Sequence, residues 1–258
     1  VGTFSWGNLT AATVAIGEFS LMFVLPLFLV NSVGLSTVRT GVVLAAMALG
    51  AFFSGASARH LAARVGAPGV VVLGLALEVV GVGLLAWTVG AQASTWFVML
   101  TLVVYGIGLG LASAQLTSTV LHDIPQEHSG AGSASQSTVR QLGSAFGAAI
   151  AGSALGSAMS HTIPDEVSST SGVPTKVLDK LVRATQDSAG SAITGLRNAS
   201  PDSPFIRSLG DARNAVIHGL ETGFAHAAAW SIGFSALFLV LGLLGSFMVM
   251  RQARRQEA

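Results

Sequence analysis

Six stretches of hydrophobic residues, each long enough to cross a lipid bilayer, dominate this 258-residue sequence. A hydrocarbon core about 30 Å thick needs roughly 20 mostly apolar helical residues to span it. Because lipid offers the backbone no hydrogen-bond partners, such stretches have to be helical. The sequence therefore predicts an all-α membrane protein with six transmembrane helices. The expected spans are residues 8–30, 41–58, 69–89, 96–120, 130–159 and 224–250.

Composition agrees with a membrane location and excludes several classes of function. Hydrophobic residues make up 51% of the chain and charged residues only 10%, whereas soluble domains carry roughly 25% charged residues. Without cysteine, the chain has no disulfides or thiolate metal sites. Neither Lys176 nor Lys180 follows a glycine, so there is no phosphate-binding loop for ATP. With no paired catalytic base, metal-ligand spacing or basic stripe, we expect neither an enzyme, nor a cofactor, nor a nucleic-acid partner.

Positive charges in short loops and tails predict which helix ends face the cytoplasm. On this basis we expect both chain ends, and the connection 122–128, on the cytoplasmic side of the cell membrane. The first residue is Val1 rather than Met, so we also expect the chain to begin part-way through a longer polypeptide. The arginines that decide the orientation are Arg59, Arg64, Arg251, Arg254 and Arg255.

The sequence divides into three expected parts. They are residues 1–160 with the first five spans, residues 161–223 as an extracellular loop or cap, and residues 224–258 as the last span and a basic tail. In the cap, residues 174–187 have apolar side chains on one helical face, which predicts an amphipathic helix. Serine and proline at 200–204 predict a turn. A second cap helix is expected over 205–217, continuing into the last span.

Four polar residues lie inside the expected spans, where lipid cannot solvate them: Glu18, Glu78, Gln115 and Arg140. Ionisable residues in such positions are rare and usually functional. Glu18, close to Thr13 in the first span, is a candidate for binding a proton or contacting a substrate. The alternative is a neutral glutamate that is hydrogen-bonded to a neighbouring helix. Glu78 shares a helical face with glycines, so it should point at another helix, either as a hydrogen-bonding group or as a second proton-coupling residue.

Arg140 stays charged, so a partner or water has to offset the free energy of its burial. It lies on one helical stripe with Ser133 and Ser137, and small residues continue that stripe. Such a helix suits the wall of a water-filled cavity that opens to the cytoplasm, and Gln115 of the fourth span would add a neutral hydrogen-bonding group. The alternative is a structural arginine that caps loop carbonyl groups.

Small residues recur at helical spacing along the fourth and fifth spans. They let helix backbones approach closely, which is how membrane helices pack. The two stripes are Gly106, Gly110, Ser113 and Thr117 in the fourth span, and Gly143, Gly147, Ala151 and Ala154 in the fifth.

Two neighbouring segments resemble a stretch that recurs in exporters of the major facilitator superfamily, above all in the fourteen-span drug:proton antiporters. They are the proline-acidic turn at 124–130 and residues 137–147, which read STVRQLGSAFG. The first span is similar as well, through residues 17–19, GEF. Residues 59–66, RHLAARVG, resemble the superfamily's cytoplasmic loop motif, with Ala63 where that motif has aspartate.

The resemblance implies the C-terminal six-helix half of a secondary transporter, with spans one, two, four and five lining a central cavity. It implies export of small amphipathic or cationic compounds in exchange for protons, by alternating access against a missing N-terminal half of six or eight helices. Two alternatives stay open: a non-transporting membrane scaffold that binds a partner through the cap, and an exporter of an endogenous metabolite or lipid. The residues implied are Glu18 and Glu78 for proton coupling, Arg140, Gln115, Ser137, Ser133 and Thr13 for the cavity, and Arg59, Arg64 and Gly66 for a cytoplasmic gating loop.

Overall fold

Six long helices make up most of the computed structural model, which describes residues 2–90, 93–121, 124–168, 170 and 172–257. All six are long and apolar enough to cross a membrane, so the prediction of an all-α membrane half-bundle is confirmed. Among the arginine and loop residues used to predict orientation, His122 and the side chains of Arg254 and Arg255 lie outside the described part. The long helices are α1 (Gly2–Asn31), α2 (Thr37–Val65), α3 (Ala67–Thr88), α4 (Thr95–Leu121), α5 (Ser129–Ser168) and α9 (Arg213–Glu257).

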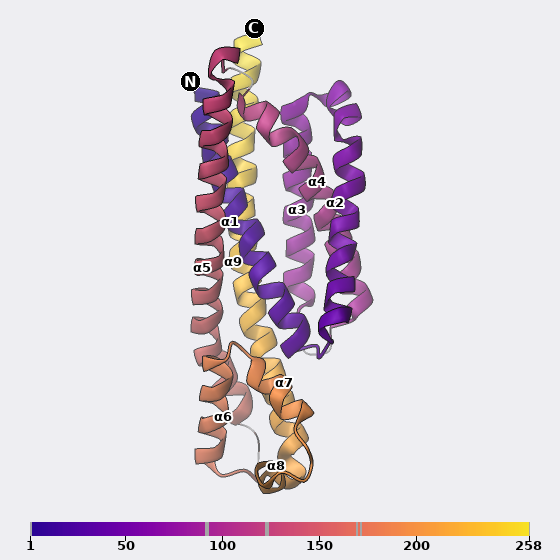
Figure 1. Cartoon of the computed structure of the whole chain (residues 1–258), viewed down its shortest axis with the longest axis vertical. Coiled ribbons are helices and arrows are strands. Elements are labelled where there is room, and N and C mark those ends of the chain that lie inside the picture. Colours follow the sequence, from indigo (N-terminus) through magenta and orange to yellow (C-terminus); the bar gives the residue numbers. More distant parts are fainter. Residues whose placement is uncertain (1, 91–92, 122–123, 169, 171, 258) are drawn as a thin grey trace.

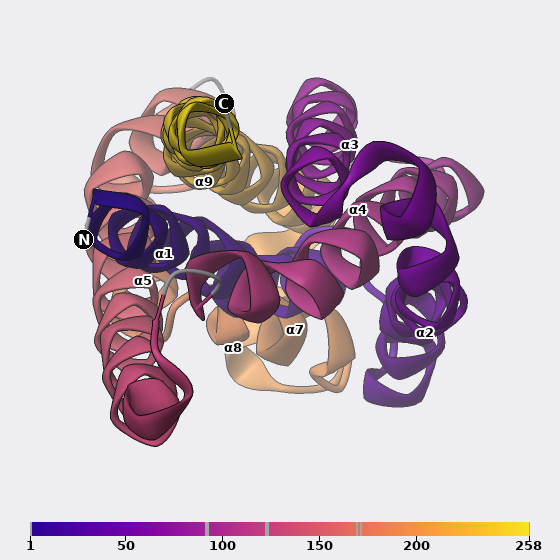
Figure 2. The same cartoon turned by 90° about the horizontal axis from the view of Figure 1, so that it is seen from above.

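The long helices form two groups of three. Helix α1 packs against α5 and α9, and α4 packs against α2 and α3, while contact between α3 and α9 joins the groups. Figure 1 shows the six helices running along the long axis of the molecule, with both chain ends at one end of the bundle. Figure 2 shows the two groups side by side.

The pairing of the helices repeats within the chain. If α1, α2 and α3 are exchanged with α4, α5 and α9, the pair α1–α5 becomes α4–α2, and α1–α9 becomes α4–α3. The pair α3–α9 maps onto itself. Two three-helix repeats related by a pseudo-two-fold axis would give this pattern, which is how the halves of many secondary transporters are built.

Glycines allow the closest helix contacts. A Cβ atom at Gly106 of α4 would lie 2.1 Å from the carbonyl oxygen of Met47 in α2. A Cβ atom at Gly147 of α5 would lie 2.5 Å from the carbonyl oxygen of Ile16 in α1. The expectation that the small-residue stripes mediate helix packing is therefore confirmed at these glycines. The α4 stripe turns away from its neighbour at Thr117, which is exposed.

The connection between α2 and α3 is shorter than the sequence suggested. A loop was expected over 58–68, but α2 continues to Val65 and only Gly66 separates it from α3. Arg59 and Arg64 therefore lie in the last turns of α2, where both are exposed. The alanine-rich sequence favours the helix, whereas Gly66 adopts a φ of 76° that ends it. Pro68 then lies in the first turn of α3.

A cap of short helices lies at the end of the bundle opposite the chain ends (Figure 1). It consists of α6 (Thr175–Asp187), α7 (Ser191–Asn198), α8 (Pro204–Leu209) and the 3-10 turn η2 (Gly210–Ala212). The predicted amphipathic helix and the turn at 200–204 are confirmed. Helix α7 was not predicted. The expected helix 205–217 is interrupted at Gly210, which has a φ of 52°, before α9 begins and continues into the last span.

Arg197 of α7 anchors the cap to the end of α1. Its guanidinium donates hydrogen bonds to the carbonyl oxygens of Val30, at 3.4 Å, and Asn31, at 3.0 Å. It also forms an ion pair with Glu221 of α9. The Thr194 hydroxyl donates a 3.1 Å hydrogen bond to the side-chain oxygen of Asn31. These bonds satisfy carbonyl groups that the end of a helix leaves without partners, and they tie α1, α7 and α9 together.

Candidate functional site

An ion pair between α1 and α5 forms the centre of the candidate site. Nη2 of Arg140 lies 3.2 Å from Oε2 of Glu18 and donates a hydrogen bond to it. The Glu18 side chain is only 6% exposed, whereas that of Arg140 is 39% exposed. The guanidinium therefore separates a buried carboxylate from an open side of the bundle. The sequence predicts that a partner or water accompanies Arg140 without naming it, and the structure identifies Glu18 as a partner.

Close packing of the two helix backbones makes this pair geometrically possible. Gly143 and Gly147 of α5 leave no room for a side chain against Ala12 and Ile16 of α1. The hydroxyl of Ser20 donates a 2.8 Å hydrogen bond to the carbonyl oxygen of Gly147, in a buried environment. Helices α1 and α5 are therefore held together by backbone contact on the same side as the ion pair.

Glu78 lies in the interior of the bundle, between α3 and α4. It is fully buried, and its side chain packs against Gly108 of α4. The prediction that it points at another helix is confirmed. The expected hydrogen bond is not formed, because neither carboxyl oxygen has a hydrogen-bond partner among the described residues. An unpartnered buried carboxyl group is costly, so this position calls for an explanation beyond packing.

The three ionisable groups within the spans of α1, α3 and α5 form one electrostatic cluster. Glu78 is close enough to interact electrostatically with both Glu18 and Arg140. Tyr105 of α4 interacts with both glutamates, and its hydroxyl also lacks a hydrogen-bond partner among the described residues. Sequence reasoning missed Tyr105. The signal that could have found it is that this residue is the single tyrosine of the chain and lies inside a span.

The other cavity candidates are more scattered. Ser133 and Ser137 lie on the α5 stripe that leads to Arg140, half-buried and exposed respectively. Gln115 is half-buried on α4 and accepts a 3.3 Å hydrogen bond from the Ser118 hydroxyl. Thr13 differs from the expectation, because it lines a groove between α1 and α9 and its hydroxyl donates to carbonyl groups of its own helix. Arg59, Arg64 and Gly66 lie at the α2–α3 connection, on a different helix pair.

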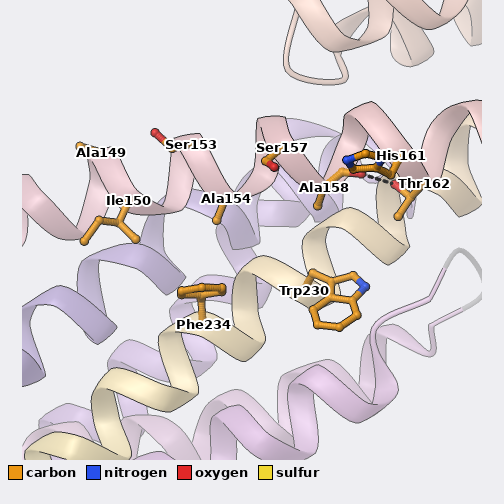
Figure 3. Close-up of a pocket in the computed structure, with 10 residues that line it drawn as sticks. All are labelled: Ala149, Ile150, Ser153, Ala154, Ser157, Ala158, His161, Thr162, Trp230 and Phe234. Atoms are coloured by element: carbon orange, nitrogen blue, oxygen red, sulfur yellow. Dashed lines mark hydrogen bonds between the residues drawn. The ribbon is translucent and has the colours of Figure 1, made fainter.

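A second feature that the sequence did not reveal is a groove of about 770 Å³ between α5 and α9. Figure 3 shows the ring of Phe234 on α9 turned towards Ala154 on α5, and Trp230 of α9 also lines the groove. His161 lies at one end of the groove. The groove does not include Glu18 or Arg140, so it is separate from the charged cluster.

A bundle of membrane-spanning helices that buries a charge pair next to an open face is typical of membrane transport proteins. Residues 3–148 match the sequence profile of the Major Facilitator Superfamily. The chain belongs to this superfamily, a family of transporters rather than enzymes.

Individual relatives support this assignment. The chain is 30% identical over 152 residues to the uncharacterized MFS-type transporter YvkA of Bacillus subtilis, covering 58% of this chain and 34% of the relative. It is 27% identical over 149 residues to the riboflavin transporter RibZ of Clostridioides difficile, covering 57% and 32%. It is 23% identical over 165 residues to the multidrug transporter protein MdtP of Bacillus subtilis, covering 64% and 30%. The matched region thus spans about a third of each of these relatives.

Proposed function

We propose that this chain is the C-terminal half of a proton-coupled transporter of the fourteen-span drug:proton antiporter type, exporting small amphipathic or cationic compounds. The observation that carries this proposal is the ion pair between buried Glu18 and half-exposed Arg140 across the α1–α5 contact. A relative named as a multidrug transporter supports the substrate class. The relative named as a riboflavin transporter makes a metabolite the second candidate substrate.

Exchange of protons for substrate requires that the two bind alternately. The Glu18 carboxylate can serve as the site for which they compete. Its carboxylate is neutralised by Arg140 in the present arrangement. A proton on Glu18 removes the attraction, and a cationic substrate that reaches the carboxylate replaces the guanidinium as its partner. Because both neutralise the same carboxylate, the two cannot bind together. Arg140 can leave its partner at a modest free-energy cost, because a water-filled cavity would hydrate its 39% exposed side chain.

The electrostatic cluster would link this exchange to movement of the helices. Release of the ion pair loosens one of the side-chain contacts between α1 and α5, and rocking of this bundle against an N-terminal half of six or eight helices then gives alternating access. Glu78 would act as a second proton-coupling residue inside the same bundle. Gln115, Ser133 and Ser137 would line the cavity, and Arg59, Arg64 and Gly66 would form the gate at the α2–α3 connection.

The proposed setting is the cell membrane, with both ends of this chain in the cytoplasm and the cap outside. The arginines at the α2–α3 connection and at the end of α9 support this orientation. A cysteine introduced at exposed Ser208 of the cap should then react with an impermeant thiol reagent added to whole cells. A cysteine at exposed Ser57, in the half of α2 that leads to the α2–α3 connection, should not react.

The test of the transport role uses the complete transporter that contains this chain. Glu18→Gln should abolish proton-driven accumulation of fluorescent amphipathic cations, and of riboflavin if this is the substrate, in inside-out vesicles. The matched control is Glu127→Gln, which neutralises an exposed glutamate next to α5 and should leave accumulation unchanged. Wild-type accumulation in a correctly folded Glu18→Gln transporter would overturn the role of Glu18. Accumulation that does not depend on a proton gradient in the wild type would overturn the proposed function.

A further inference from the structure

The groove between α5 and α9 opens beside a surface suited to lipid. Along α9, large apolar side chains are exposed at intervals of three or four residues over the whole span, which places them on one face of the helix. No charged residue interrupts this row. The polar stripe of α5 that leads to Arg140 lies on the other half of that helix, towards the chain ends. The exposed row consists of Trp230, Phe234, Leu237, Leu241, Leu244 and Met248.

The groove also has two chemically different ends. Trp230 and His161 lie towards the cap, and there Nδ1 of His226 is 3.2 Å from Oε1 of Glu166. Further into the span the groove is lined mainly by alanines, Ile150 and Phe234, with Ser153 and Ser157 as the polar residues between them. A neighbouring depression extends it along α9 to Leu237. Tryptophan is enriched where the membrane meets water, so we expect the polar end of the groove at headgroup level and the apolar end among acyl chains.

We propose that this groove is a binding site for one phospholipid. An acyl chain lies between α5 and α9 against Phe234, and the headgroup lies beside His161 and the His226–Glu166 pair. The imidazole N–H groups can donate hydrogen bonds to phosphate oxygens, and the Glu166 carboxylate can accept one from the headgroup amine of phosphatidylethanolamine. The polarity of the site matches that of the ligand from one end to the other.

The dimensions of the groove agree with this ligand. Its volume of about 770 Å³ leaves room for one acyl chain with its glycerol and headgroup partly outside. Small side chains at Ala154 and Ala158 leave the space between the helices open. Among the other lining residues, the aromatic rings of Phe234 and Trp230 offer large contact areas at a low cost in conformational entropy.

The experiment is native mass spectrometry of the complete transporter in detergent, titrated with dioleoyl phosphatidylethanolamine. We expect one lipid to bind saturably to the wild type. Ala154→Phe fills the groove and Trp230→Ala removes one wall. Each should weaken the apparent affinity on the order of tenfold, as expected for the loss of about two buried methylene groups. Ala45→Phe adds the same side chain at an exposed position of α2 and should leave the affinity unchanged.

Three results would overturn the proposal. The first is no saturable lipid on the wild type. The second is equal binding by the wild type and both groove variants, which would place the lipid elsewhere. The third comes from a photoreactive amino acid at Ala158: cross-linking to another helix of the complete transporter instead of to lipid would mean that protein occupies the groove. Because the measurement detects bound lipid and not transport, it does not depend on the function proposed above.

Discussion

The hydroxyl of Ser20 in α1 donates a 2.8 Å hydrogen bond to the carbonyl oxygen of Gly147 in α5, two residues along α1 from the Glu18–Arg140 ion pair. The bond is buried and requires that residue 147 be a glycine, because a Cβ atom there would lie 2.5 Å from the carbonyl oxygen of Ile16. A charged pair in a membrane helix bundle can be retained only where the helices are held in fixed register. The α1–α5 contact provides that register.

The ion pair should respond unequally to loss of its two members. Arg140→Gln leaves buried Glu18 without a partner, which should destabilise the protein by up to about 3 kcal/mol. Glu18→Gln leaves an arginine whose side chain is 39% exposed, so its effect should be less than about 1 kcal/mol. The double variant Glu18→Gln/Arg140→Gln should recover most of the stability lost in Arg140→Gln. Thermal unfolding in detergent measures all three, and equal effects of the two single variants would contradict the asymmetry.

The glycine contacts give a second prediction with a matched control. Gly106→Ala forces a Cβ atom against the Met47 carbonyl, which lies 2.1 Å away, and should destabilise the protein by about 1–3 kcal/mol. Gly83→Ala is also in a membrane-spanning helix, but nothing lies within 4 Å of its added Cβ atom. That variant should be neutral or slightly stabilising because alanine favours a helix. If both variants unfolded at the same temperature, close backbone packing between α2 and α4 would not be a source of stability.

Sequence predicted the membrane helices well because their signal is local and large. Spans of roughly 20 apolar residues need only length and hydrophobicity to be recognised. The position of Glu78 against another helix was also predictable, because Gly74 and Gly81 share its face and the helix period is fixed. The amphipathic helix of the cap was recognisable for the same reason.

Contacts between residues far apart in the sequence are harder to predict from the sequence alone. Glu18 and Arg140 are separated by 122 positions in the chain, and nothing in the local pattern around either residue specifies the other. Thr13 is a cavity candidate because it lies on a helical stripe next to Glu18, and the structure places it in a groove between α1 and α9. Helix α2 continues past the expected span to Val65, because the apolar run ends at Ala58 whereas the alanines and arginines that follow it are good helix formers.

The anchor between the cap and α1 gives a third prediction. Arg197→Ala removes the hydrogen bonds to Val30 and Asn31 and the ion pair with Glu221. We expect faster amide hydrogen exchange in α7 and at the end of α1, and a lower unfolding temperature. Arg207→Ala is the control, because its ion pair with Asp202 is 3.5 Å long and highly exposed. Pairs of that kind contribute little. Unchanged exchange in Arg197→Ala would mean that apolar packing alone holds the cap.

Glu78 gives the last prediction, which separates stability from function. The carboxyl group is fully buried without a hydrogen-bond partner among the described residues. Replacing it with an apolar side chain of similar length removes an unsatisfied polar group, which costs about 1–3 kcal/mol when buried. Glu78→Met should therefore unfold at the same temperature as the wild type or above it. A lower unfolding temperature would show that the carboxyl group has a stabilising partner, such as a buried water.

Transport by the Glu78 variants should decrease, although their stability is expected to stay the same or increase. If the residue carries a proton, Glu78→Met and Glu78→Gln should both lose proton-driven accumulation in inside-out vesicles while remaining folded. Tyr105→Phe removes the neighbouring unpartnered hydroxyl without changing the shape of the ring, and it tests whether that group assists. Full transport by Glu78→Met would restrict proton coupling to Glu18. A buried carboxylic acid that lowers stability is explained only if it is needed for function, so stability and transport should be measured on the same preparations.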